Sequence, residues 1–357
     1  MTIQKKYKIV FLYTELASYF ISCAQALAES GKAEVHIVRW PLNKEAPFDF
    51  NFPASVKVYT KTGFTSEKLH ELVNEINPDL IYCSGWVDKL YRKICKKYVK
   101  KIPVVVGIDN QWDGSFKQRL AGWLNFIFIK PYYNAAWVPG ESQKKFALHL
   151  GFSSEKIQTG YYCADTDHFH KFYLNNRENK KQHFPKRFIY VGRYLQFKGI
   201  FEMWEAFIEL QNENPNEWEL WCLGTGAKYD QRKEHEKIKH FGFVQPGEIE
   251  EHIKNTGVFI LPSTFEPWGV VVHEFAASGF PMICTDKVGA AERFLEEDKN
   301  GFLIEAGSKS AIKEAMKKMM KKTDTELFEM GEQSVKKAME LTPEIWVRNL
   351  VEFIEKP

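Results

Sequence analysis

The sequence passes from an apolar strand through a polar turn into a helix at Phe259-Ile-Leu-Pro-Ser-Thr-Phe-Glu-Pro-Trp-Gly-Val-Val-Val-His-Glu274. A strand that leads directly into a helix is the repeating unit of a parallel α/β sheet. Ligands of such sheets bind at the carboxyl ends of the strands. This stretch therefore predicts an α/β fold and places two carboxylates, Glu266 and Glu274, at a candidate ligand site.

The start of this helix is expected to face the ligand. Pro267 suits the first helical position, so the amides of Trp268, Gly269 and Val270 would point outward and attract phosphate. At a rise of about 1.5 Å per residue, the two glutamates would stand roughly 10–12 Å apart. That separation suits the two ends of a nucleotide sugar. The alternative is structural: Glu266 caps the helix and Glu274 is solvated surface.

Short apolar runs alternate with helix-like stretches along the whole chain. In the first half the predicted strands are Lys8–Tyr13, Glu34–Arg39, Val56–Tyr59, Leu80–Cys83, Val104–Ile108 and Ala135–Val138. In the second half they are Phe188–Val191, Trp218–Leu223, Lys239–Val244, Val258–Leu261, Met282–Thr285 and Phe302–Ile304. This alternation predicts two doubly wound, Rossmann-like domains with parallel sheets, facing each other across a cleft.

The domain boundaries follow from composition. Residues 1–169 are predicted to form the first domain and residues 187–340 the second, with the polar stretch 170–186 as the link between them. The last segment, Pro343–Glu355, has the spacing of an amphipathic helix. This C-terminal helix, within residues 343–357, is expected to pack on either domain, including back on the first.

The charge of the chain is small but uneven. Its 357 residues carry a formal net charge of +3, which does not argue for a nucleic-acid partner. Residues 1–169 contain 22 Lys and Arg against 16 Asp and Glu, whereas the remainder contains 27 against 30. The basic first half suits an anionic acceptor or an anionic membrane surface, or it is ordinary solvated surface.

The cysteines indicate a reducing compartment. Six cysteines are scattered without any C-x-x-C pair: Cys23, Cys83, Cys95, Cys163, Cys222 and Cys284. Several lie inside apolar runs, so they are expected to be buried, reduced thiols. No segment offers the ~18 uninterrupted apolar residues of a membrane span. Both observations favour the cytoplasm.

A second candidate site element opens the second domain. A buried strand, Phe188–Val191, runs into Gly192, and two cations follow at Arg193 and Lys198. Arg would contact a diphosphate with two hydrogen bonds, whereas Lys would act as a point charge. The alternative is that Arg193 pairs with a surface carboxylate and Lys198 is solvated.

Together these motifs resemble the retaining glycosyltransferases of family 4, also called glycosyltransferase group 1, which have the GT-B fold. The resemblance rests on the Gly-Arg-(x4)-Lys-Gly run at 192–199, the Pro-Ser-x-x-Glu-Pro-x-Gly run at 262–269 and the E-x7-E spacing of Glu266 and Glu274. Further similar segments are Tyr161–Phe169, Trp221–Gly226, Gly289–Glu292 and Asn300–Ile304. It is specific over about residues 160–306, and rests on strand–helix order before that.

The resemblance implies roles for particular residues. Arg193 and Lys198, next to Gly192, match the pair that holds the donor diphosphate and stabilises the leaving group. Glu266 matches the glutamate that contacts the transferred sugar, and Glu274 the one that binds the ribose hydroxyls. The amides of Gly269 and Val270 match the phosphate-binding helix start. No cofactor and no metal requirement are implied, since the two cations replace the metal.

Phe243 and Val244 occupy the usual position of the nucleobase in this family, at the end of the third strand of the second domain. Apolar core is the alternative for both. In this family the departing phosphate oxygen is usually proposed to accept the proton of the acceptor, so no enzymic base is required. Glu266 would then orient the donor sugar.

The first domain departs from the family pattern in two places. The turn after the first strand, Tyr13-Thr-Glu-Leu-Ala-Ser-Tyr19, lacks the glycines that allow close backbone approach to phosphate. The family also often carries a histidine after the fourth or fifth strand, where Asp109 stands here. Asp109 would hold a sugar hydroxyl or help to take the acceptor proton, or it forms an Asx turn.

The expected function is transfer of a sugar, with retention, from a nucleotide diphosphate sugar to a glycan or lipid-linked acceptor in bacterial surface polysaccharide synthesis. The aromatic stretch from Trp112 to Tyr133 would stack on sugars, enter a lipid interface or pack as ordinary helices. Peripheral association with the inner face of the membrane is a further expectation. The alternatives are a sugar-nucleotide epimerase or hydrolase of the same fold, and a non-catalytic nucleotide-sugar-binding partner.

Overall fold

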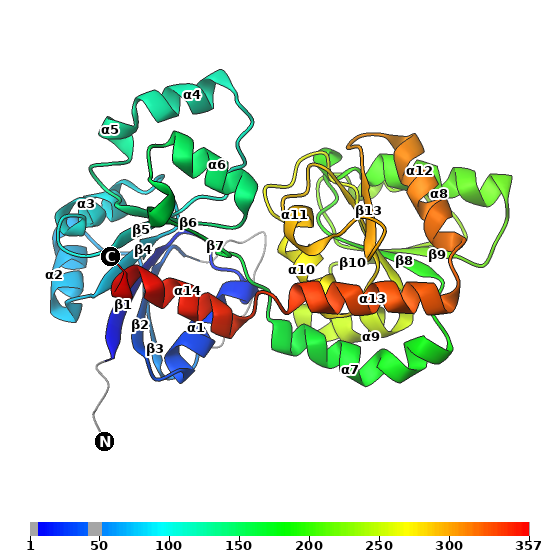
Figure 1. Cartoon of the computed structure of the whole chain (residues 1–357), viewed down its shortest axis with the longest axis horizontal. Coiled ribbons are helices and arrows are strands. Elements are labelled where there is room, and N and C mark those ends of the chain that lie inside the picture. Colours follow the sequence, from blue (N-terminus) through cyan, green and yellow to red (C-terminus); the bar gives the residue numbers. More distant parts are fainter. Residues whose placement is uncertain (1–5, 42–51, 357) are drawn as a thin grey trace. The chain divides into compact units, whose positions relative to one another are not determined.

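The computed structural model describes residues 6–41 and 52–356, and it divides into two compact units (Figure 1). The first unit comprises Met1–Asp165 together with Leu341–Pro357, and the second comprises Thr166–Glu340. The chain therefore enters the second unit after Asp165 and returns to the first unit at Leu341. Each unit is described by itself.

The described residues of the first unit form a parallel sheet of seven strands in the order β3-β2-β1-β4-β5-β6-β7. Its strands are β1 Tyr7–Tyr13, β2 Ala33–Arg39, β3 Val56–Thr60, β4 Leu80–Cys83, β5 Val104–Gly107, β6 Ala135–Val138 and β7 Ile157–Thr159. Its helices are α1 Ser18–Glu29, α2 Ser66–Ile76, α3 Lys89–Tyr98, α4 Phe116–Trp123, α5 Asn125–Phe128, α6 Glu141–His149 and α14 Pro343–Glu355. The strand order reverses between β1 and β4, which are neighbours at the centre of the sheet.

The central strands are buried on both faces. Residues Ile9–Leu12 in β1 and Leu80–Tyr82 in β4 are fully buried. A parallel strand covered by helices on both sides needs apolar side chains at successive positions, which explains the continuous apolar runs in the sequence.

Helix α14 belongs to the first unit although it follows the whole second unit in the chain. It packs against α1, and the indole N–H of Trp346 donates to the Tyr161 carbonyl at 2.8 Å. The Trp346 ring lies beside Trp137, with centroids 4.7 Å apart, and stacks on Phe11. The apolar face of this helix therefore fills the core of the first unit.

The second unit is a parallel sheet of six strands in the order β10-β9-β8-β11-β12-β13 among its described residues. The strands are β8 Arg187–Val191, β9 Glu219–Leu223, β10 Ile238–Gly242, β11 Val258–Leu261, β12 Met282–Thr285 and β13 Gly301–Ile304. The helices are α7 Thr166–Gln182, α8 Ile200–Glu213, α9 Ile249–Asn255, α10 Val270–Ala277, α11 Ala291–Phe294, α12 Lys309–Met320 and α13 Asp324–Ala338. Here the strand order reverses between β8 and β11.

The predicted linker at 170–186 is wrong, because most of it is helix α7 of the second unit. The helix is polar in composition, yet it buries Phe169, Phe172, Asn176 and Lys180 against the unit, where it packs on α10 and α13. A helix needs only one narrow apolar stripe to be held on a domain, so a high polar content does not by itself indicate a link.

The two predicted parallel α/β folds are confirmed, as are six buried cysteines without a disulfide. Among residues 6–41 and 52–356, none of the helices combines the length and the apolar character that crossing a bilayer requires.

Candidate functional site

The second sheet carries the predicted site residues at the point where its strand order reverses. Lys198 follows β8 and Glu266 follows β11, and these two strands are neighbours in the sheet. The crevice at such a reversal, beyond the carboxyl ends of the strands, is where open α/β sheets bind ligands. The topology therefore brings together two motifs that lie 68 positions apart in the sequence.

The loop after β8 is held tightly against the loop after β11. Both Thr264 and Phe265 donate their backbone N–H to the carbonyl of Phe197, at 2.8 and 3.4 Å. Gly199 has a φ of +67°, and a Cβ there would lie 2.0 Å from the carbonyl oxygen of Pro262. Only glycine fits this backbone position, which sets the place of Lys198 immediately before it.

Lys198 and Glu266 form an ion pair. Their side chains are only 13% and 14% exposed, so each charge has lost most of its hydration and depends on the other. The structure thus does not support a solvated Lys198. It places one cation and one carboxylate in direct contact at the reversal point.

Arg193 lies in the same loop and has a different environment. Its side chain is exposed, and within the described part of the chain its guanidinium has no ion-pair or hydrogen-bond partner. Its backbone is held, because the Tyr190 hydroxyl donates to the Arg193 carbonyl at 2.9 Å. The predicted alternative, a pair with a surface carboxylate, is therefore not seen.

Glycines let three neighbouring loops meet beside Arg193. A Cβ on Gly224, after β9, would lie 2.0 Å from the Gly192 carbonyl oxygen, and the Gly224 N–H donates to the carbonyl of Gly242 at 2.6 Å. A Cβ on Gly226 would lie 2.7 Å from the Tyr194 carbonyl oxygen. The glycines of these motifs thus allow close backbone packing at the carboxyl end of the sheet.

Helix α10 begins at Val270, so the prediction of Pro267 as its first residue is wrong. Glu266 instead forms a bridge with Val288, and Ala290 donates its N–H to the Trp268 carbonyl at 2.8 Å. Gly269, with a φ of +90°, then turns the chain into the helix. Pairing with the segment after β12 outweighs the local preference of proline for a helix start.

The amides predicted to face a ligand still lie at this turn. Gly269 is the N-cap of α10 and Val270 its first residue, so the N–H groups of Gly269, Val270 and Val271 lie at the helix start. The Trp268 side chain is buried, so only its backbone faces the turn. Free N–H groups at a helix start are suited to binding an anion.

The remaining predicted residues of this unit lie on neighbouring elements. Glu274 is half-buried within α10, one turn after its start. β10 ends at Gly242, so Phe243 and Val244 follow the strand instead of ending it. Phe243 is 51% exposed, which excludes the core alternative for that side chain.

Asp109 lies in the first unit, just after β5, where the Tyr162 hydroxyl donates to its Oδ2 at 3.2 Å. The hydroxyls of Tyr13 and Tyr161 are 2.6 Å apart in the same cluster. Burial raises the pKa of Tyr162, and the nearby Tyr19 and Asp109 raise it further. These tyrosines were not predicted as site residues, because apolar strand ends give no local signal of function.

The turn after β1, which lacks the glycines of the family pattern, is fixed by contacts of Thr14 with Ser84. The Thr14 N–H donates to the Ser84 hydroxyl at 2.9 Å, and the two hydroxyls are 3.1 Å apart. This links the loops after β1 and β4 at the reversal point of the first sheet. The first backbone N–H of this turn, that of Thr14, is therefore bound by the Ser84 side chain.

Solved structures share the fold of this chain. The structure of Alr3699/HepE from Anabaena in complex with UDP and glucose matches with a TM-score of 0.71 and 16% identity, covering 98% of this chain and 100% of the other. The lipopolysaccharide outer core galactosyltransferase WaaB matches with a TM-score of 0.67 and 15% identity, covering 98% and 99%. The chain thus has the α/β fold of these GT-B proteins.

Curated relatives match part of the sequence. The lipopolysaccharide 1,6-galactosyltransferase of Escherichia coli (strain K12) is 28% identical over 129 residues, which are 34% of this chain and 35% of the relative. The putative teichuronic acid biosynthesis glycosyltransferase TuaC of Bacillus subtilis (strain 168) is 31% identical over 128 residues, 36% and 31% of the two chains. The chain thus matches about a third of the length of these relatives.

The family model described as "Glycosyl transferases group 1" matches residues 174–338. That range covers nearly all of the second unit and includes Arg193, Lys198, Glu266 and Glu274. The sequence of the second unit is therefore similar to the glycosyl transferases group 1 family over most of its length.

Proposed function

We propose that this protein is a glycosyltransferase that moves a sugar from a nucleotide diphosphate sugar to a glycan or lipid-linked acceptor. The observation that carries the proposal is the contact between Lys198 and Glu266 at the reversal point of the second sheet. Arg193 and the amides at the start of α10 add positive potential beside it. Similar solved structures of Alr3699/HepE are complexes with UDP and with UDP-glucose, which supports this donor class.

In the proposed mechanism, the donor diphosphate takes over Lys198 from Glu266. A diphosphate carries more charge than one carboxylate, so it competes for the ammonium group, and Arg193 adds a bidentate contact. The cations then stabilise the charge that develops on the leaving phosphate as the bond to the sugar breaks. With two cations and several amides in this role, the reaction proceeds without a metal ion.

The carboxylates position the donor in this scheme. Glu266, released from Lys198, accepts hydrogen bonds from the hydroxyls of the transferred sugar, and Glu274 accepts from the ribose. The leaving phosphate oxygen accepts the acceptor proton on the same face of the sugar, as in family 4, so the anomeric configuration is retained. Phe243 and Val244 contact the base, and Asp109 contributes from the first unit.

The proposed acceptor class follows the names of the relatives. They include proteins named for lipopolysaccharide, teichuronic acid and capsular polysaccharide biosynthesis. We infer an acceptor of the same kind for this chain, a growing surface glycan or its lipid-linked precursor.

Acceptor-dependent nucleotide release tests the proposal. The full chain is incubated with UDP-, GDP- and ADP-sugars, with and without lipid-linked and oligosaccharide acceptors, and released nucleoside diphosphate is measured. Release that requires an acceptor, and that falls at least about 100-fold in Lys198→Ala, is expected. Equal release without acceptor would identify a hydrolase, and binding without any release would identify a non-catalytic partner.

A further inference from the structure

Helices α4 and α5 of the first unit expose large apolar side chains. Trp123 is 84% exposed, Phe116 78% and Phe126 62%, and Ile127 and Phe128 are nearly half exposed. Neither helix has a single buried residue. Large apolar side chains exposed close together in the chain are typical of an interaction surface. We define the apolar surface as Phe116, Leu120, Trp123, Phe126, Ile127 and Phe128.

The apolar side chains of α4 lie on one helix face, and that face points outward. Phe116, Leu120 and Trp123 are spaced i, i+4, i+7, so they form one stripe. The opposite side carries Gly122, where a Cβ would lie 2.6 Å from the carbonyl oxygen of His149 in α6. Close contact at Gly122 seats the helix on α6 and leaves its apolar stripe in solvent. Ordinary helix packing, one prediction for this stretch, therefore does not account for these residues.

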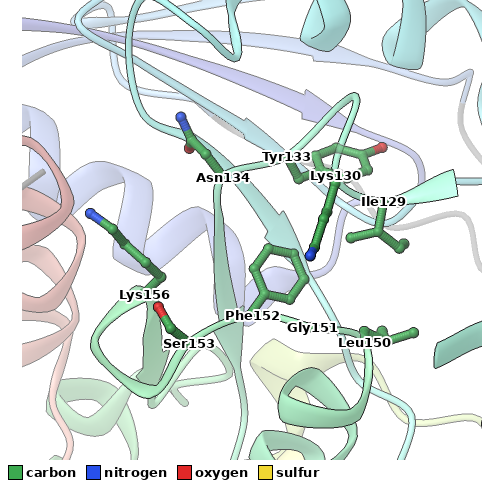
Figure 2. A pocket seen from close by; sticks show the side chains of 9 residues that line it. All are labelled: Ile129, Lys130, Tyr133, Asn134, Leu150, Gly151, Phe152, Ser153 and Lys156. Atoms are coloured by element: carbon green, nitrogen blue, oxygen red, sulfur yellow. The ribbon is translucent and has the colours of Figure 1, made fainter. Parts of the chain in front are cut away.

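A pocket of about 210 Å³ lies beside α5 (Figure 2). It is formed by the turn after α5, with Lys130 and Asn134, and by the segment after α6, with Ser153 and Lys156. Figure 2 shows the ring of Phe152 between Lys130 and Lys156 in this view. The pocket adjoins α5, because a Cβ on Gly151 would lie 2.7 Å from the amide nitrogen of Asn125 and 3.4 Å from Cε of Lys130.

The charge of this region complements an anion. Two lysines line the pocket and no carboxylate does. Across residues 115–156, which include both helices and the pocket, there are six Lys and Arg against two Glu, whereas the whole chain has a net charge of only +3. Neither Lys130 nor Lys156 has an ion-pair partner among the described residues.

We propose that this face docks on an anionic lipid bilayer, with the apolar surface in the interface and the Lys130–Lys156 pocket on a lipid phosphate. Exposed Trp and Phe beside lysines are the pattern of a surface that lies in a membrane interface. Protein–protein interfaces are depleted of lysine, which disfavours a second copy of the chain as the occupant. The inference goes beyond sugar transfer, because docking requires neither donor nor acceptor.

Vesicle sedimentation of the full chain, without nucleotide, tests the proposal. Vesicles of phosphatidylcholine alone are compared with vesicles of equal parts phosphatidylcholine and phosphatidylglycerol. The parent is expected to bind the anionic vesicles more tightly, and added salt is expected to weaken that binding. Trp123→Ser/Phe126→Ser is expected to weaken it about tenfold or more, because both side chains lose their burial in the interface.

The lysines are tested separately with a charge-matched control. Lys130→Ala/Lys156→Ala is expected to lose about fivefold per lysine on anionic vesicles and nothing on neutral ones. Lys181→Ala/Lys254→Ala removes two exposed lysines of the second unit, and Leu174→Ser removes an exposed apolar side chain there; both are expected to bind like the parent.

Three outcomes would overturn docking on the bilayer, and a fourth would overturn the assignment of the pocket. The first is that the parent does not bind anionic vesicles. The second is that Trp123→Ser/Phe126→Ser, with an unchanged melting curve, binds them like the parent. The third is self-association of the parent in analytical ultracentrifugation that Trp123→Ser/Phe126→Ser abolishes while vesicle binding is unchanged. If Lys130→Ala/Lys156→Ala lowers affinity for inorganic phosphate but not for vesicles, the pocket serves free phosphate and the headgroup assignment fails.

Discussion

Lys198 and Glu266 each neutralise the other where the donor phosphates are expected. The two side chains are mostly buried and in contact, so removing one takes away an opposite charge that stabilises the other. In the proposed mechanism an incoming diphosphate therefore competes with Glu266 for Lys198. We then expect the two residues to have opposite effects on nucleotide binding, although both would be needed for transfer.

The opposite signs are measurable by calorimetric titration with nucleoside diphosphates. Glu266→Gln is expected to bind nucleoside diphosphate about fivefold more tightly, because Lys198 loses its competitor, while sugar transfer is lost. Lys198→Ala is expected to bind at least about tenfold more weakly. Lys181→Ala serves as the control. If Glu266→Gln and Lys198→Ala bound nucleoside diphosphate equally more weakly than the parent, the ion pair would have only a structural role.

Lys180 in α7 is buried, and among the described residues no carboxylate pairs with it. It is 5% exposed, its Nζ lies 3.6 Å from the centre of the Phe280 ring, and that nitrogen has no hydrogen-bond partner among the described residues. Burial lowers the pKa of Lys180 to about 7. Folding must therefore remove either the proton or the hydration of Lys180. This lowers the free energy of unfolding of the second unit at every pH at which Lys180 is protonated in the unfolded chain.

Lys180→Met is expected to raise the free energy of unfolding by roughly 2–4 kcal/mol near neutral pH. The pKa of Lys180 is lower in the folded protein than in the unfolded chain, so its destabilising effect is complete below the folded pKa. The effect decreases as the pH rises from about 7 to about 10.5, because in this range the unfolded chain binds the proton and the folded protein does not. Urea unfolding at about pH 6 and about pH 9 should show a smaller difference at the higher pH. A constant difference would contradict the assignment.

At the scale of elements, the turn between β11 and α10 depends on Gly269. Its φ is +90°, and a Cβ there would lie 3.0 Å from Cγ of Glu266. Gly269→Ala is expected to cost about 1–2 kcal/mol of stability and to displace the Glu266 side chain, lowering transfer. Gly247→Ala, at a position with open space around the Cβ, should change stability by less than about 0.5 kcal/mol. Thermal unfolding and turnover of both variants check these expectations. Parent-like stability and turnover of Gly269→Ala would contradict the tight turn.

The strand–helix alternation was predictable because it follows from local apolar runs, and α14 was placed at Pro343–Glu355 as observed. Two errors have a tertiary cause. Pairing of Glu266 with Val288 delays the start of α10, and no local pattern carries that contact. Helix α7 is polar but is anchored by Arg177, whose guanidinium donates to Glu332 in α13 at 2.6 Å. A partner 155 positions away is invisible to a composition argument.

The candidate site residues of the second unit can be picked out from the sequence because glycine, proline and charged residues stand out after apolar strands. In the first unit, Tyr162 and Ser84 cannot be picked out in this way. Their roles arise only when the sheet brings the loop after β1 to the loop after β4, and the loop after β5 to the segment after β7, as in the contacts of Ser84 with Thr14 and of Tyr162 with Asp109. The charged candidates can thus be found from the sequence, whereas the hydroxyl groups that contact Asp109 and Thr14 can be found only from the fold.

At the scale of the whole molecule, the first unit is completed by the end of the chain. Trp346 is 1% exposed, and its contacts with Phe11, Phe20, Trp137 and Tyr161 lie within that unit. Trp346→Ala is expected to cost about 3–5 kcal/mol. Hydrogen exchange should show loss of protection in β1, β6 and α1 but unchanged protection in β8–β13. Equal loss in both units would contradict this division.

Calorimetric titration of the parent and Arg193→Ala/Lys198→Ala with UDP, GDP and ADP tests the central claim most directly, namely that the loop after β8 binds the donor diphosphate. One of the three nucleotides is predicted to bind the parent, and the double variant is predicted to bind it about 100-fold more weakly or not at all. A double variant that keeps the parent's melting curve and binds the nucleotide as tightly as the parent would contradict the account.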